Sequence, residues 1–129
     1  MITSGFTRES SEGLVVIQCQ FVEHEVALAL DTGASHTVID LTALLIADYA
    51  LADAIRTTLV ETASGIIEAY VFRVQSFTAL GITRTNFEVC AYDFFAKHVL
   101  IDFDGVLGLD FIADYHICID FRASTITLS

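Results

Sequence analysis

A run of apolar and small residues that ends in a carboxylate constrains this chain more than any other stretch. Residues 26–30 are Val-Ala-Leu-Ala-Leu, Asp31 follows directly, and Gly33 comes two residues later. The run predicts a buried strand, and the glycine allows a turn that a residue with a Cβ would resist. A carboxylate at the end of a buried strand costs free energy unless it is paired, hydrogen-bonded or used in chemistry. Asp31 is therefore the first candidate for a functional residue.

Residues 30–35, Leu-Asp-Thr-Gly-Ala-Ser, resemble the active-site motif of the single-domain, retropepsin-like aspartic proteases. The second landmark of that family is a pair of apolar residues followed by a glycine and a short helix, and residues 105–112 match it. Its closing pair of strands is matched by residues 117–121 and 124–128. The resemblance covers nearly the whole chain and implies a mostly β, retropepsin-like acid-protease fold.

Apolar alternation predicts most of the strands of such a fold. Residues 14–21 and 25–30 alternate, which indicates two strands joined by a hairpin at residues 23–24. Two more strands are expected within residues 76–91, around the sequence Leu-Gly-Ile. A short β-branched strand is expected at residues 37–39.

Two helices interrupt the strands. Asp40 is placed to cap a main helix at residues 41–52, in which leucines and a tyrosine fall at helical spacing. A shorter helix is expected near residues 109–114. The main helix is interpreted as core packing and not as part of any site.

A hairpin with a small, polar tip is predicted in the middle of the chain. Residues 57–60 and 66–74 are rich in β-forming side chains, and residues 61–65 between them are Glu-Thr-Ala-Ser-Gly. Its place along the chain matches the flap of retropepsins, which opens for an extended peptide and closes over it. The alternative is an ordinary surface hairpin.

Composition bounds the class of protein. The chain has 129 residues, of which 54% are hydrophobic, enough for one domain at residues 14–129. Residues 1–13 are polar and aperiodic, and we expect a flexible segment there. No apolar tract approaches the ~20 residues of a membrane span. The first residues lack the pattern of a secretory signal, which favours a cytoplasmic location. The net charge of −11 argues against nucleic acid as a partner.

Metal and cofactor sites are not indicated. The odd number of cysteines and the absence of Cys-x-x-Cys spacing argue against disulfides and zinc, so Cys19, Cys90 and Cys118 are predicted to be buried free thiols. Residues 102–105, Asp-Phe-Asp-Gly, do not continue as a calcium loop and are interpreted as a turn. The remaining candidates are histidines that lack helical pairing: His24, His36, His98 and His116.

Peptide hydrolysis by carboxylates needs one general base and one general acid. The chain has a single Asp-Thr-Gly, so a dyad requires Asp31 from each of two subunits, and we expect a homodimer. The strand at residues 124–128 is expected to pair with its symmetry mate. The resemblance implies that residues 28–30 and 106–108 support the Asp31 loop from either side.

The resemblance also assigns site residues. The catalytic set is Asp31 with Thr32, which cross-links the two loops, and Gly33, which lets its backbone approach the carboxylates. The residues expected to bind substrate are Ala34, Ser35, Ser64, Gly65 and Ile66.

The chain departs from the retroviral pattern at two positions that act together. Many retroviral enzymes pair an Asp with an Arg where this chain has Ser35 and Leu109. Because both ends of the pair are lost, no orphan buried charge remains. Two functions stay open: an aspartic endopeptidase acting on extended peptide or protein substrates, and a non-catalytic dimerisation or peptide-binding module.

Overall fold

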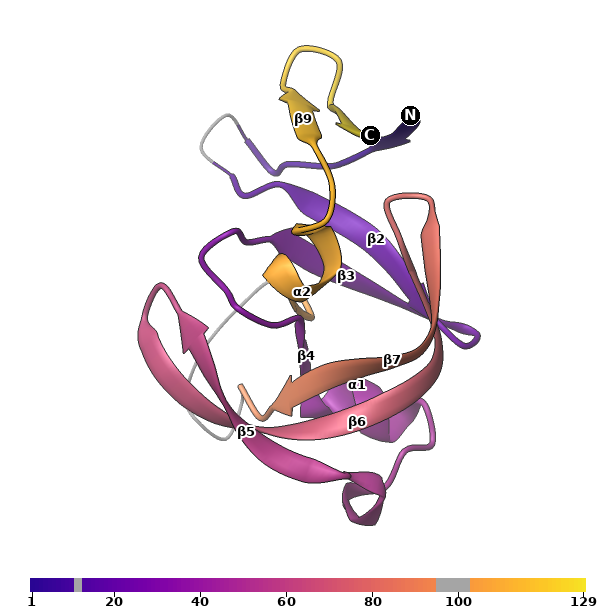
Figure 1. Cartoon of the computed structure of the whole chain (residues 1–129), viewed down its shortest axis with the longest axis vertical. Helices are drawn as coiled ribbons and strands as arrows, with labels where there is room; N and C mark the ends of the chain where they lie inside the picture. The colour runs from indigo at the N-terminus through magenta and orange to yellow at the C-terminus, as the bar shows by residue number, and fades with distance from the viewer. Residues whose placement is uncertain (11–12, 95–102) are drawn as a thin grey trace.

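The chain folds into two β-sheets with two short α-helices, as a computed structural model that describes residues 1–10, 13–94 and 103–129 shows (Figure 1). The larger sheet runs in the order β2-β3-β8-β4-β7-β6-β5. Its strands are β2 (Val16–Phe21), β3 (His24–Leu30), β4 (Val38–Asp40), β5 (Arg56–Thr62), β6 (Gly65–Ala79), β7 (Ile82–Tyr92) and β8 (Gly105–Leu107). An additional pairing of β2 with β6 closes the sheet on itself, which leaves β5 outside the closed part.

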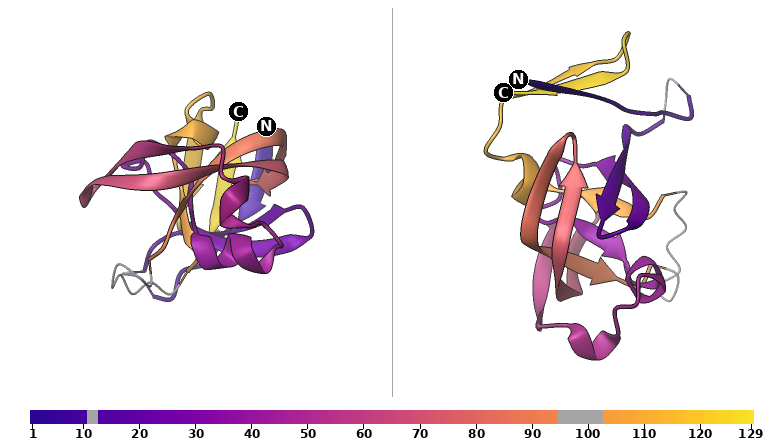
Figure 2. Two further views of the ribbon diagram at one scale, coloured as in Figure 1. Left: turned by 90° about the horizontal axis from the view of Figure 1, so that it is seen from below. Right: turned by 90° about the vertical axis from the view of Figure 1, so that its right-hand side faces the viewer.

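The smaller sheet joins the two ends of the chain. It runs in the order β1 (Ile2–Gly5), β10 (Thr125–Leu128), β9 (Ile117–Asp120), and both termini lie in it (Figure 2). Regular structure in the first thirteen residues was not expected from the sequence. The partner of β1 is a strand at the far end of the chain, which no local pattern reveals. Because β10 has neighbours on both sides, the expectation that its own edge is free for a symmetry mate is wrong.

The main helix is shorter than the sequence predicts. Helix α1 covers only Leu41–Ile46, and a separate 3-10 turn follows at Leu51–Asp53. The helix stops because Asp48 adopts a left-handed φ of 69°, while the N–H of Tyr49 bonds back to the carbonyl of Leu44 at 3.1 Å. Asp40 does precede the helix, but its side chain makes no capping hydrogen bond.

The hairpins were predicted more accurately. The β2–β3 turn lies one residue before the expected position, at residues 22–23, because Phe21 pairs with His24. In the middle hairpin, β5 and β6 pair from Arg56–Val71 to Thr62–Gly65, so its tip is Ala63-Ser64. Strand β6 then continues unbroken to Ala79 and turns into β7, which makes one long strand of the segments expected to be separate.

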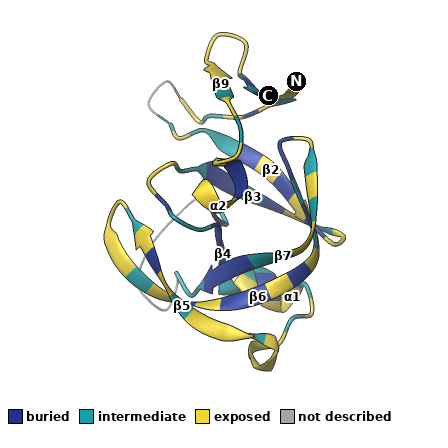
Figure 3. Cartoon of the chain, viewed as in Figure 1, coloured by how far each residue is buried: buried dark blue, intermediate teal, exposed yellow. Residues whose placement is uncertain are grey.

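The core lies inside the closed part of the larger sheet. Buried residues alternate with more exposed ones along strands such as β2 and β6, as the dark bands in Figure 3 show. The largest buried side chains are Phe21, Phe72, Phe77 and Phe111, and the last of these comes from helix α2 (Leu109–Ile112). Cys19 and Cys90 are buried as predicted, whereas Cys118 on β9 is exposed. The prediction for Cys118 fails because β9 is an edge strand of the small sheet, and its residues 118–120 are all exposed.

Within residues 1–10, 13–94 and 103–129, no helix is both long and apolar enough to cross a membrane. His98, and the first residue of the turn expected at residues 102–105, lie outside the described residues.

Candidate active site

Two strands from distant parts of the sequence hold the loop that carries Asp31. Strand β3 runs parallel to β8 with Leu30 beside Leu107, and β8 also pairs with β4. The backbone N–H of Asp31 donates to the carbonyl of Leu107 at 3.0 Å. The N–H of Leu30 donates to the carbonyl of Val15 at 2.9 Å. The predicted support of the loop from both sides is confirmed.

The Asp31 carboxylate is half-buried and held by its own loop. Its Oδ1 accepts a hydrogen bond of 2.8 Å from the N–H of Gly33, and its carbonyl accepts one of 3.2 Å from Ala34. A Cβ on Gly33 would lie 3.1 Å from Oδ1, tighter than ordinary contact. Glycine therefore gives the carboxylate room, while Thr32 is exposed at the end of the loop.

The loop is also tied to the start of α2. The N–H of Leu109 donates to the carbonyl of Ala34 at 2.9 Å, and the N–H of Gly108 donates to Thr37 Oγ1 at 3.2 Å. A Cβ on Gly108 would clash with the carbonyl of His36 and lie 2.9 Å from that of Ala34. Only glycine allows the helix to approach the loop this closely.

Asp110 and Thr37 form a contact that the sequence did not reveal. Asp110 Oδ1 accepts hydrogen bonds from the N–H of Thr37 at 2.9 Å and from its hydroxyl at 2.8 Å. Loss of hydration raises the pKa of Asp110, and the two hydrogen bonds from Thr37 act against that rise. The only sequence signal was an acidic residue in the first turn after Gly108, a position that favours negative charge.

The tip of the middle hairpin lies over the Asp31 loop. The N–H of Ser35 donates to the carbonyl of Glu61 at 3.0 Å, and the N–H of Glu61 donates to Ser35 Oγ at 3.1 Å. The Cβ of Ala63 is 3.8 Å from the position a Cβ on Gly33 would take. The structure thus brings the hairpin and the Asp31 loop together, through a residue pair that the sequence did not suggest.

The predicted substrate-binding residues divide into two groups. Ala34 is buried and Ser35 half-buried in the Asp31 loop, where Ser35 contacts the hairpin. Ser64, Gly65 and Ile66 are exposed at and beside the hairpin tip.

Other candidate acids and nucleophiles have structural roles. Asp104 Oδ2 accepts a hydrogen bond of 2.8 Å from the N–H of Ala27, and Asp110 Oδ1 accepts one of 2.9 Å from the N–H of Thr37. Burial raises the pKa of Cys19 to about 12 and, together with nearby Asp110, raises that of Cys90 to about 12, so both thiols stay protonated. No group of three or more His, Cys, Asp or Glu side chains in the described parts of the chain could hold a metal ion.

Comparison with known proteins supports the resemblance that the sequence motifs indicated. The family model described as aspartyl protease matches residues 17–111, which include the Asp31 loop, the hairpin and most of α2. Among solved structures, the chain is similar to a retropepsin-like aspartic protease from Rickettsia conorii, with a TM-score of 0.68 and 19% identity over 98% of this chain and 89% of that one. The fold is therefore retropepsin-like. No curated protein matches the chain in sequence.

Proposed function

Because the chain belongs to the aspartyl protease family, we propose that it is an aspartic endopeptidase whose water is activated by the Asp31 carboxylates of two subunits. The observation that carries this proposal is the fixed Asp31 loop, bonded to Leu107 through its backbone and to Gly33 through Oδ1. A carboxylate held in this way needs little reorganisation before reaction.

The chemistry requires two such carboxylates close together. At about 3 Å and an effective dielectric near 20, two negative charges repel by about 5 kcal/mol. The pair therefore shares one proton over a broad acidic range, and the two groups titrate as a unit. The ionised carboxylate removes a proton from water while the protonated one donates to the carbonyl oxygen of the peptide. Thr32, exposed beside Asp31, is available to contact the matching loop of the partner.

The second carboxylate comes from a second copy of the chain. Asp104 accepts a hydrogen bond from the backbone N–H of Ala27 on β3, and Asp110 accepts one from the N–H of Thr37, so neither is free to complete the dyad. In the small sheet, the edges available to another subunit are those of β1 and β9, since β10 is already paired on both sides. Addition of strands at these edges would build the homodimer.

The substrate enters by replacing a contact within the chain. Ser35 and Glu61 bond through backbone groups much as adjacent strands do. We propose that the β5–β6 hairpin is a flap, and that its opening frees the N–H of Ser35 and the carbonyl of Glu61 for the backbone of an extended peptide. The flap tip with Ser64, and Gly65 and Ile66 beside it, then closes over the peptide, while Ser35 lines the floor. Ala34, also expected to bind substrate, is fully buried beneath that floor.

The experiment is cleavage of an unfolded protein, with casein as the probe, across the pH range 3–8. Wild-type protein is expected to give a bell-shaped acidic profile, and Asp31→Asn is expected to give no cleavage with an unchanged circular dichroism spectrum. Adding Asp31→Asn chains to wild-type chains should lower activity more than dilution does, because mixed dimers hold one acid.

Two results would contradict the proposal. A rate that still rises through pH 8 would require a different nucleophile. Absence of cleavage at every pH, together with no binding of a transition-state-mimicking peptide inhibitor, would instead favour a non-catalytic peptide-binding or dimerisation module.

A further inference from the structure

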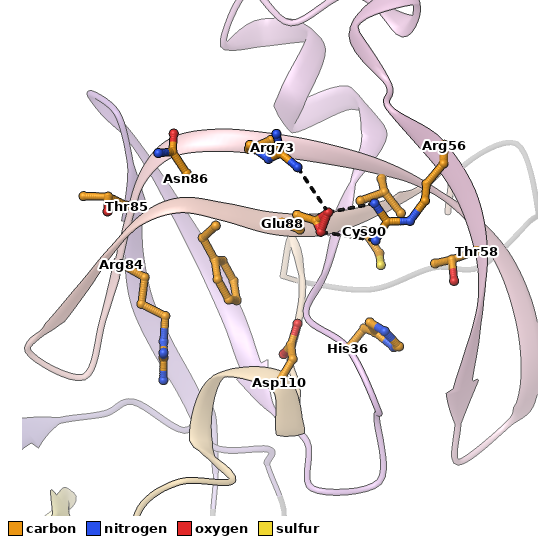
Figure 4. Close-up of a pocket in the computed structure, with 12 residues that line it drawn as sticks. His36, Arg56, Thr58, Arg73, Arg84, Thr85, Asn86, Glu88, Cys90 and Asp110 are labelled. Carbon is orange, nitrogen blue, oxygen red and sulfur yellow. Dashed lines mark hydrogen bonds and ion pairs between the residues drawn. The ribbon is translucent and has the colours of Figure 1, made fainter.

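A cavity of about 510 Å³ lies beside the candidate active site, between the β5–β6–β7 strands and the start of α2. Figure 4 shows Arg56, Arg73 and Glu88 together on the strands, with His36 and Asp110 facing them across the cavity. We call this cavity the arginine pocket. Its volume is within the range of ~300–1,000 Å³ that small ligands and side chains occupy in proteins.

The arginine pocket concentrates the positive charge of the chain. Arg56, Arg73 and Arg84 all line it, and the whole sequence has only six Lys and Arg residues against seventeen Asp and Glu. The pocket contains two carboxylates, Glu88 and Asp110. It therefore carries an excess of positive charge in a protein whose net charge is −11.

One carboxylate is shared between two of the arginines. Arg56 donates two hydrogen bonds to Glu88, from Nη1 to Oε1 at 2.7 Å and from Nη2 to Oε2 at 3.2 Å. Arg73 Nη2 lies 3.7 Å from Glu88 Oε1. The hydrogen bond from Arg56 lowers the pKa of Glu88, which stays ionised under mildly acidic conditions. Arg56 and Arg73 carry two positive charges and Glu88 carries one negative charge, so the two arginines can bind a second carboxylate.

The third arginine is held in place by helix α2. Arg84 Nη2 donates to the carbonyl of Phe111 at 2.8 Å, and its guanidinium carbon lies 4.7 Å from the centre of the Phe111 ring. Oδ1 of Asp110, a residue that also lines the cavity, already accepts a hydrogen bond from the hydroxyl of Thr37. Arg84 is thus a fixed positive charge in the wall, with no carboxylate among its described hydrogen-bond partners.

The arginine pocket adjoins the path that an extended peptide would follow. His36 in its wall is the neighbour of Ser35, and the two side chains bond at 2.7 Å between Oγ and Nδ1. Thr58 in its wall lies three residues before Glu61 on β5. Ser35 and Glu61 form the contact between the loop and the hairpin. The arginine pocket therefore adjoins this contact, through His36 on the loop and Thr58 on the hairpin.

We propose that the arginine pocket binds an Asp or Glu side chain of the peptide substrate and selects for it at a fixed distance from the cleaved bond. This inference rests on the proposed function. A two-fold dimer holds two such pockets, so the preference is expected at two symmetric positions, one on each side of the bond. Elsewhere the acidic protein repels acidic peptides, and salt near 0.15 M screens that repulsion beyond ~8 Å.

The first test uses a random octapeptide library at pH 5.5, with each position in turn fixed as Glu or as Gln. Glu is expected to raise kcat/KM about tenfold at one position on each side of the cleaved bond, the effect of one hydrogen bond to a charged group. Equal kcat/KM for Glu and Gln at every position would overturn the proposal.

Two variants should shift this preference in opposite directions. Glu88→Gln removes the competing carboxylate and should increase the Glu/Gln ratio, whereas Arg56→Gln should decrease it towards one. Both side chains lie at the surface, and a purely structural role would move the ratio the same way in both. Arg122→Gln, in the turn between β9 and β10, changes the net charge by the same amount as Arg56→Gln and should leave the ratio at its wild-type value.

Binding separates this proposal from the proposed function. Fluorescence anisotropy with Asp31→Asn protein compares labelled Glu and Gln forms of one octapeptide without any cleavage. Tighter binding of the Glu form, enhanced by Glu88→Gln, supports the arginine pocket even if the wild-type protein cleaves nothing. Equal binding of both forms overturns it, even if the protein is an active protease.

Discussion

Thr37 gives both its backbone N–H and its hydroxyl to a single oxygen, Oδ1, of Asp110. Thr37 is fully buried, and its hydroxyl oxygen also accepts the N–H of Gly108. One carboxylate oxygen thereby connects the end of the Asp31 loop to α2. Positions 35 and 109, where many retroviral enzymes are expected to pair an acid with an arginine, are Ser and Leu in this chain. The neutral donor Thr37 and the carboxylate of Asp110 join the loop to α2.

Asp110→Asn should leave this attachment intact while removing its charge. The amide oxygen can accept both hydrogen bonds from Thr37. Because the folded pKa of Asp110 is raised, the wild-type carboxyl contributes stability that is present below the unfolded pKa and lost as pH rises through the folded pKa. We expect the variant to lie within about 1 kcal/mol of wild type at pH 7 and to show a weaker loss of stability above pH 4. Urea unfolding at several pH values measures both.

The opposite outcome for Asp110→Asn is easily recognised. A variant that is strongly destabilised at pH 7, with the pH dependence of wild type, would mean that the negative charge itself holds the loop.

Gly108→Ala should be strongly destabilising. Its Cβ would meet the carbonyls of His36 and Ala34, both of which are backbone groups that cannot turn aside. We expect a loss of about 2–4 kcal/mol in the free energy of unfolding, measured by denaturant titration. Gly5→Ala is the matched control, because the nearest atom to its Cβ would be 3.9 Å away and the change should cost less than about 1 kcal/mol. Similar losses in the two variants would contradict this packing.

Ser35→Ala should loosen the hairpin without unfolding the protein. The variant loses the Oγ that accepts the N–H of Glu61 and keeps the backbone bond from Ser35. A lost hydrogen bond of about 1 kcal/mol should speed exchange of the Glu61 amide about fivefold, as measured by NMR. Ser64→Ala is the control, since Ser64 contributes only its backbone N–H to the described hydrogen bonds. Unchanged exchange in Ser35→Ala would mean that the hairpin does not rest on this hydroxyl.

Cys118 should be the only one of the three thiols that reacts rapidly with iodoacetamide at pH 7.5. Cys19 and Cys90 are buried, and their raised pKa leaves almost no thiolate. Mass spectrometry should find one label per chain, and none in Cys118→Ser. If β9 pairs with a second subunit, labelling should also slow as protein concentration rises. Rapid labelling at two sites would contradict the burial of the other cysteines.

The sequence predicted the strands of the larger sheet well because their signal is local. The expected strands matched β2 and β3 within two residues and placed the turn of the middle hairpin correctly, but β6 continues from the expected end at residue 74 to Ala79. The Asp-Thr-Gly motif lies in the loop between β3 and β4. The end of α1 was missed because it depends on the left-handed backbone conformation of Asp48. Aspartate tolerates this conformation, but its presence in a sequence does not predict it. A helix pattern that continues through such a residue is ambiguous in sequence.

The parts that were missed depend on long-range partners. β1 exists because β10 lies beside it, and Ser35 meets Glu61 across twenty-six residues. The arginine pocket likewise collects residues from β5, β6 and β7 that have no shared motif. Hydrophobic periodicity reports which side of a strand is buried, but it does not report which strands become neighbours.

The pairing of β1 with β10 also orders events during synthesis. Ile2 is synthesised well before its partner Leu128, and β10 must also pair with β9. The larger sheet can assemble earlier, since its strands end at Leu107. A nascent chain therefore carries an Asp31 loop before it has the terminal sheet proposed to recruit a second subunit. The proposed homodimer, and with it the proposed protease activity, would therefore form only after β10 has been synthesised.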